Sequence, residues 1–127
     1  MTDAERKRIA EGWIRLARTR DPTLLDALLT EDVVWTLPGR STMSGEVRGR
    51  DGVARRLETV AGSGVNIDLR HVLYGRDDVA VLLHNTGERD GRVLDEQLIT
   101  LLRLRDGRIY RAETLVSDVS MLNAFFV

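Results

Sequence analysis

Leu94 to Asp118 read LDEQLITLLRLR-DG-RIYRAETLVSD, and this stretch decides the fold. Two runs rich in apolar and β-branched residues lie on either side of Asp106-Gly107, and charged residues are densest next to that pair. An Asp-Gly pair between two such runs is the strongest short-range signal for a β-hairpin. The stretch therefore predicts two long antiparallel strands joined by a tight turn.

The residues before this hairpin predict two more strands. Asp90-Gly91 marks a second hairpin, and the run before it, at 79–86, is apolar on both faces, which is typical of an inner strand. Residues 65–70 alternate strictly between apolar and polar side chains, and the strand that they predict extends to Tyr74. The second half of the chain thus predicts an antiparallel meander of four strands.

Helical patterns dominate the first half of the chain. Within residues 3–18, apolar side chains recur at helical spacing around Trp13, with one stripe to be buried. Asp21-Pro22 then provides an N-cap followed by proline in the first turn, which predicts a second helix through Leu29. Two helices in succession therefore precede the first strand.

One short strand and a third helix complete the pattern. Residues 33–37 form a β-rich run that Pro38 stops, because proline is confined to strand ends and edges. Residues 39–49 are rich in Gly, Ser and Thr and predict a loop. Asp51 predicts the N-cap of a third helix that continues through Val60.

The composition limits the partners and the location. The 127 residues include 19 basic and 20 acidic side chains spread along the chain, and the formal charge is -1. No basic stripe could neutralise phosphates, so neither nucleic acid nor membrane is an expected partner. There is no cysteine and there are only two histidines, so we expect no metal site. The absence of an apolar leader, or of a run near the ~20 residues of a membrane span, predicts a cytoplasmic protein.

Five short motifs carry a resemblance to a known family. In chain order they are LLTEDVVW (28–35), PG (38–39), SG (44–45), RGRDGV (48–53) and RLRDGRI (103–109). This order resembles the SnoaL-like branch of the NTF2-like superfamily, to which the ketosteroid isomerases also belong. The resemblance implies an α+β fold with residues 1–127 in a single domain. In this NTF2-like cone, a curved antiparallel sheet wraps around the N-terminal helices and holds an apolar pocket.

The resemblance also indicates where the catalytic groups of related enzymes would lie. Ketosteroid isomerases use an aspartate base, a tyrosine and a protonated aspartate, and these positions fall on Leu37, Trp13 and Thr100. SnoaL-type cyclases use a histidine and an aspartate, whose positions fall on Thr100 and Thr114. None of these catalytic side chains is retained. A threonine hydroxyl can orient a substrate, but it is no general base near neutral pH without activation.

The turn of the last hairpin determines which side chains face the pocket. A two-residue turn would place Arg111 and Glu113 on the apolar face, which is costly. A three-residue loop instead pairs Thr100 with Ala112 and keeps both charges on the other face. We predict this second register. The pocket floor then consists of Leu98, Thr100, Leu102, Ala112, Thr114 and Val116.

The turn of the preceding hairpin leaves two alternatives open. A two-residue turn directs Asn85 into the cavity opposite Glu96, whereas a three-residue loop directs His84 there, and the apolar pattern fits both. In the second case the carboxylate raises the basicity of the imidazole, and His84 and Glu96 form a catalytic pair for proton transfer. Otherwise His84 fills a partly buried strand position and Asn85 binds the substrate.

Aromatic and apolar residues outside these hairpin faces suggest further contacts. Trp13 and Trp35 either bind a flat substrate in the cavity or pack in the core. Ile99 and Leu101 make the opposite face of the sheet apolar, which suggests a homodimer. The tail at 121–127 carries both phenylalanines and closes the core, forms a dimer contact or covers the cavity as a lid.

Two functions are compatible with the sequence. The first is a cofactor-independent enzyme of isomerase or cyclase type, which acts on a small apolar, cyclic, oxygenated substrate by proton transfer or ring closure. The second is a non-catalytic binding or dimerisation module, for which the loss of both acid/base patterns is expected. The enzyme needs at least one titratable group with a shifted pKa in the cavity.

Overall fold

The computed structural model describes all residues from Met1 to Val127. It contains four helices and six strands. In chain order these are α1 (Asp3–Thr19), α2 (Pro22–Leu28), β1 (Leu29–Leu37), β2 (Gly45–Arg48), α3 (Gly49–Ala61), β3 (Asn66–Tyr74), β4 (Val79–Arg89), β5 (Arg92–Arg105), β6 (Arg108–Val116) and α4 (Val119–Phe125).

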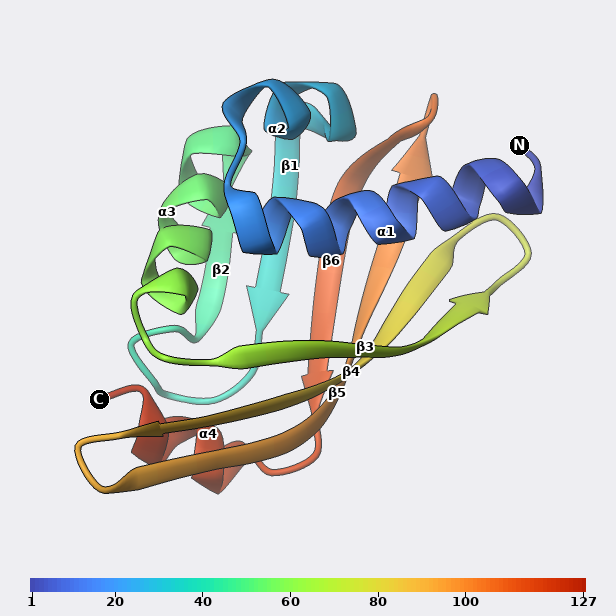
Figure 1. Ribbon diagram of the computed structural model, residues 1–127. Coiled ribbons are helices and arrows are strands. Elements are labelled where there is room, and N and C mark those ends of the chain that lie inside the picture. The colour runs from blue at the N-terminus through green and yellow to red at the C-terminus, as the bar shows by residue number, and fades with distance from the viewer.

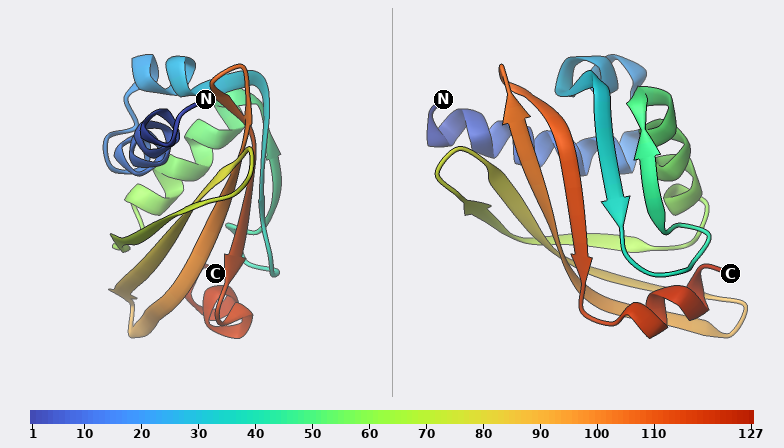
Figure 2. Two further views of the ribbon diagram at one scale, coloured as in Figure 1. Left: turned by 90° about the vertical axis from the view of Figure 1, so that its right-hand side faces the viewer. Right: turned by 180° about the vertical axis from the view of Figure 1, so that it is seen from behind.

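The strands form one curved sheet in the order β2-β1-β6-β5-β4-β3. All neighbours are antiparallel except β1 and β6, which are parallel. The sheet does not close, and α1 lies across its concave side (Figure 1). Helices α1, α2 and α3 all lie on that side, and no helix covers the middle of the other face (Figure 2). The predicted α+β cone is therefore confirmed.

The ends of the helices follow from their capping residues, with one correction. The Thr2 hydroxyl accepts the Glu5 backbone N–H at 3.1 Å, and the Glu5 carboxylate accepts that of Thr2 at 3.2 Å, which forms a capping box. Asp21 caps α2 as predicted. The prediction that Asp51 caps α3 is wrong, because α3 begins at Gly49 and Asp51 lies in its first turn. There the negative charge of Asp51 still interacts favourably with the helix dipole.

Strand β2 is absent from the prediction, which treated residues 39–49 as a loop. Three of its four residues are exposed, and only Val47 is half-buried. An edge strand with one inward side chain shows too little alternation to be recognised from its sequence.

The register predicted for the β5–β6 hairpin is wrong. Asp106 and Gly107 have φ of 52° and 78°, as in a two-residue turn with both residues left-handed. Tyr110 is then an extra residue, because Leu104 pairs with Ile109 and Arg103 with Arg111. This bulge shifts the register so that Thr100 lies opposite Thr114, and not opposite Ala112. The bulge nevertheless keeps Ala112, Thr114 and Val116 on the predicted face.

The β4–β5 hairpin has the same turn without a bulge. Asp90 and Gly91 have φ of 53° and 77°, and the pairing continues without a shift from the turn onward. Asn85 therefore lies opposite Glu96, which is the first of the two predicted alternatives.

Two hydrophobic clusters fill the concave side. The larger one joins α1, α2 and α3 to the sheet. The smaller one contains Leu122, Phe125 and Phe126. The C-terminal tail therefore closes the core, which is one of the three roles predicted for it. None of the four helices combines the length and the apolar character that a membrane crossing demands.

Candidate functional site

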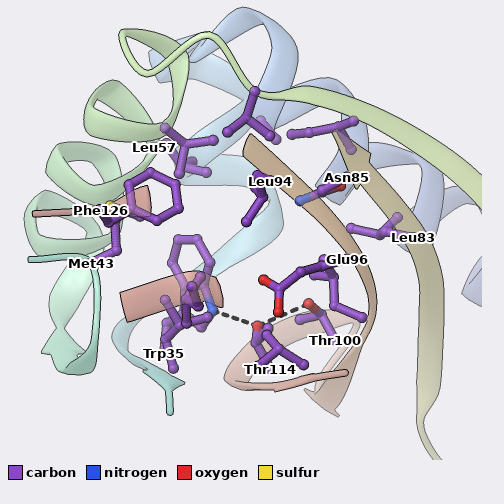
Figure 3. A pocket seen from close by; sticks show the side chains of 18 of the residues that line it. Trp35, Met43, Leu57, Leu83, Asn85, Leu94, Glu96, Thr100, Thr114 and Phe126 are labelled. Carbon is purple, nitrogen blue, oxygen red and sulfur yellow. Dashed lines mark hydrogen bonds between the residues drawn. The ribbon is translucent and has the colours of Figure 1, made fainter. Parts of the chain in front are cut away.

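A cavity of about 70 Å³ lies between the concave side of the sheet and helices α1, α3 and α4 (Figure 3). This volume is several times the ~10–15 Å³ that one water molecule needs. Of its 20 lining residues, 16 are hydrophobic, so a ligand must be largely apolar. The four polar lining residues are Asn85, Glu96, Thr100 and Thr114.

Two tryptophans form an aromatic wall. The rings of Trp13 and Trp35 meet edge to face, with centroids 5.1 Å apart and an interplanar angle of 81°. Behind Trp35, the guanidinium of Arg56 lies 5.0 Å from the ring centroid and donates to the carbonyls of Trp35 at 3.1 Å and Gly45 at 3.0 Å. Burial lowers the pKa of Arg56. This packing holds the Trp35 indole in one orientation.

A pair of hydroxyls lies beside that indole. Thr100 and Thr114 face each other on β5 and β6, with their Oγ1 atoms 2.9 Å apart. The Trp35 Nε1–H donates to Thr114 Oγ1 at 2.9 Å. Neither hydroxyl has another protein partner, so only one of their two protons is used within the pair, whichever residue donates. One O–H donor is therefore free for an oxygen in the cavity.

Glu96 is the ionisable side chain that lines the cavity. It is only 1% exposed, and its Oε1 accepts the Asp118 backbone N–H at 3.1 Å. Burial raises the pKa of Glu96 above its usual value; the Asp118 hydrogen bond opposes this shift and the Asp118 carboxylate adds to it. A carboxyl group whose pKa is shifted toward neutrality is suited to donate and accept protons.

Asn85 lies directly across from Glu96, on β4, and also lines the cavity. Its Oδ1 is buried and has no hydrogen-bond partner in the protein. Because a buried polar atom without a partner costs free energy, a ligand that donates a hydrogen bond here would be favoured.

The predicted pairing of His84 with Glu96 is wrong. The unbulged β4–β5 hairpin turns Asn85 inward, so His84 points to the outer face of the sheet. There His84 Nε2 lies 2.6 Å from Oδ1 of Asp95, whose side chain is 64% exposed. The imidazole therefore does not reach the cavity.

Most of the other predicted residues come together at the cavity. These are Trp13, Trp35, Leu37, Asn85, Leu98, Thr100, Thr114 and Val116. The prediction is wrong for Leu102 and Ala112, which are fully buried but do not line the cavity. Both lie nearer the hairpin turn, where side chains of α1 and α2 fill the concave side.

Several lining residues come from a loop that the prediction did not assign to the pocket and from the C-terminal tail, for which covering the cavity was one of three predicted roles. Met43 lies in the loop before β2, and Leu122 and Phe126 belong to the C-terminal tail. The loop and the tail are tied together, since the Thr42 backbone N–H donates to the Phe126 carbonyl at 3.0 Å. The two tail phenylalanines were the only sequence signal for this closure.

The cavity offers one carboxylate. Nowhere in the chain do three or more His, Asp or Glu side chains form a group that could hold a metal ion.

Comparisons with known proteins agree with this fold. The family model of the SnoaL-like domain matches residues 10–112. An uncharacterised protein of Mycobacterium tuberculosis is 26% identical over 98% of this chain and 97% of its own length. The structure of an NTF2-like protein from Burkholderia xenovorans, 20% identical, superposes with a TM-score of 0.86 over 100% of this chain and 99% of that one. IdmH of Streptomyces antibioticus, a proposed polyketide cyclase, is 23% identical, with a TM-score of 0.72 over 95% and 98%. The chain therefore belongs to the SnoaL-like family, and its fold is that of the NTF2-like proteins.

Proposed function

We propose that this protein is a cofactor-independent enzyme of isomerase or cyclase type that moves a proton on a small, apolar, cyclic, oxygenated substrate. The observation that carries the proposal is the buried carboxyl group of Glu96 in an apolar cavity, beside a free hydroxyl donor. Membership in the SnoaL-like family supports this class, as does the likeness in fold to IdmH, a proposed polyketide cyclase.

Glu96 is the proposed acid and base. Its carboxylate takes a proton from a carbon next to a substrate carbonyl, while the free hydroxyl of the Thr100–Thr114 pair donates to the oxygen on which negative charge develops. Return of the proton to a different atom completes an isomerisation. Attack of the enolate carbon on a second carbonyl of the same molecule, followed by protonation of the new alkoxide, closes a ring.

The remaining cavity walls select the substrate. The edge-to-face tryptophans present broad apolar surface to a ring. The unpartnered Asn85 Oδ1 accepts a hydrogen bond from a substrate hydroxyl. A compact ring system with a carbonyl and a hydroxyl group fits both features.

Deuterium exchange tests this proposal without knowledge of the natural substrate. Indanone, tetralone and cyclohexenone are incubated with the protein in heavy water, and loss of the proton next to the carbonyl is followed by NMR. We expect the wild type to accelerate exchange on at least one ketone, and Glu96→Gln to lower that rate about 10²- to 10⁴-fold. Glutamine retains an oxygen for the Asp118 N–H, so the fold is preserved. Exchange that is equally fast in Glu96→Gln, or absent for all three ketones, would reject the proposal.

We also propose that a second copy covers the outer face of the sheet. Leu115, 58% exposed, lies there opposite half-buried Ile99, and Leu101 is on the same face. Leu115→Asp should convert a dimer into a monomer in sedimentation velocity. A wild type that stays monomeric at high micromolar concentration would contradict this.

A further inference from the structure

We infer that the substrate of this cavity is an acid, whose anionic group, a carboxylate or a phenolate, binds Arg18 at the mouth of the cavity. The inference deepens the proposed function, because it takes the cavity as the substrate site. It concerns recognition of the substrate and not the proton transfer.

A surface hollow adjoins the cavity, between the last turns of α1 and α3 and the start of β3. Ala17, Val60, Val65 and Ile67 line both spaces. These four side chains form the boundary between the two spaces, so a ligand that extends from the cavity between them reaches the hollow directly.

The hollow is positively charged. Its polar lining side chains are Arg18, Arg20 and Asn66, and no Asp or Glu lines it. Arg20 is already neutralised, since its Nε lies 3.2 Å from Glu58 Oε1. Arg18 has no carboxylate partner within ion-pair distance. The positive charge of Arg18 is thus available to a ligand.

The guanidinium of Arg18 is held in place at the mouth. Its Nη2 donates to the Ile67 carbonyl at 3.0 Å, and Ile67 is one of the residues shared by the hollow and the cavity. Arginine has five N–H donors, and this bond uses one of them. The others remain free for the paired hydrogen bonds that a guanidinium forms with a carboxylate.

The interior of the cavity excludes the alternative that the anion lies deeper. Its ionisable side chain is Glu96, which is itself an acid, and no cation lines the cavity. A second anion there would be stripped of water without compensation and would be repelled by ionised Glu96. A substrate whose apolar body fills the cavity and whose anionic group lies outside, at Arg18, fits both the apolar interior and the charged hollow.

A matched pair of probes tests the inference. Cinnamate and cinnamamide share size and shape, but only the acid is charged at neutral pH, and their dissociation constants are measured by titration calorimetry at low salt. We expect the wild type to bind cinnamate more tightly than cinnamamide. Arg18→Gln should weaken cinnamate binding about fivefold and leave cinnamamide binding unchanged. Added salt should reduce the difference between the two probes.

Arg15→Gln is the control, because Arg15 is exposed on the same helix but does not line the hollow. Equal losses of cinnamate affinity in Arg15→Gln and Arg18→Gln would overturn the inference, since they would indicate a non-specific electrostatic attraction and not a contact with Arg18. Equal binding of acid and amide by the wild type, or binding of neither, would also overturn it. The deuterium exchange of Glu96→Gln is a separate measurement, so a failure of the proposed reaction is distinguishable from a failure of anion recognition.

Discussion

The two faces of the β4–β5 pair differ although their residues alternate along the same two strands. On the concave face, Asn85 and Glu96 lie opposite each other in an apolar cavity. One position away, His84 contacts Asp95 on the outer face, where water reaches both side chains. By residue type alone the histidine is the better proton carrier near neutral pH. Glu96 is nevertheless the candidate for proton transfer, because it lies inside the cavity and burial raises its pKa.

The largest contrast between the faces is expected from neighbouring leucines of β5. Leu102 is fully buried on the concave face, whereas Leu101 is half-buried on the outer face. Leu102→Ala should lower the free energy of unfolding by about 2–5 kcal/mol, because it leaves a void among packed side chains. Leu101→Ala should cost about 1 kcal/mol or less. Urea unfolding at low protein concentration measures both, and equal losses would mean that the outer face is packed as tightly as the core.

A second contrast compares two threonines. Thr114→Val leaves the Trp35 indole N–H and the Thr100 hydroxyl without their partner, so the free energy of unfolding should fall by about 1–3 kcal/mol. Thr36, on the outer face of β1 opposite Glu113, makes no side-chain hydrogen bond, and Thr36→Val should change stability by about 0.5 kcal/mol or less. The NMR resonance of the Trp35 indole proton should move only in Thr114→Val. An unmoved resonance would contradict the hydrogen bond.

The distinction between the faces could be predicted from the sequence for one hairpin and not for the other. In β6, charges alternate with small and apolar residues, so only one face can be buried, and Thr114 and Val116 were placed on it correctly. The paired register was nevertheless wrong, because the bulge at Tyr110 supplies the extra residue that a longer turn was expected to provide. In β4, both faces are apolar enough to be buried, and the choice between His84 and Asn85 depends on the turn alone.

The lining of the cavity was predicted correctly for several strand residues and for Trp13 of α1, but not for the loop before β2. Its concave floor follows from alternation, which is a local property of the sequence. Met43 and Phe126 reach the cavity through a loop and a tail that are far apart in the chain and are joined by hydrogen bonds to backbone groups. No periodicity encodes such a contact. The raised pKa of Glu96 is likewise a consequence of the assembled cavity.

The pH dependence of stability should differ between a glutamate on the concave face and one on the outer face. Burial raises the pKa of Glu96 in the folded state, so the unfolded chain loses this proton first as the pH rises. The free energy of unfolding should therefore decrease from the usual pKa of a glutamate up to the raised value, and then level off. Glu96→Gln should remove this decrease, so its stability relative to the wild type should grow with pH across that window.

Urea unfolding across this pH range checks the sign. Glu113→Gln, on the outer face, is the control for loss of one negative charge. A Glu96→Gln variant whose stability difference shrinks as the pH rises would show that the Asp118 hydrogen bond outweighs burial.

The smallest effect is expected from His84→Ala. The imidazole and its partner Asp95 lie where solvent screens their attraction, with 27% and 64% of their side chains exposed, so the free energy of unfolding should change by about 0.5 kcal/mol or less. Deuterium exchange of the ketones should be unchanged, because the imidazole is on the far side of the sheet from the cavity. Deuterium exchange that is lost in His84→Ala but kept in Glu96→Gln would indicate that His84, and not Glu96, transfers the proton in the cavity. It would require the β4–β5 hairpin to adopt the three-residue turn in solution, since only that register brings His84 opposite Glu96.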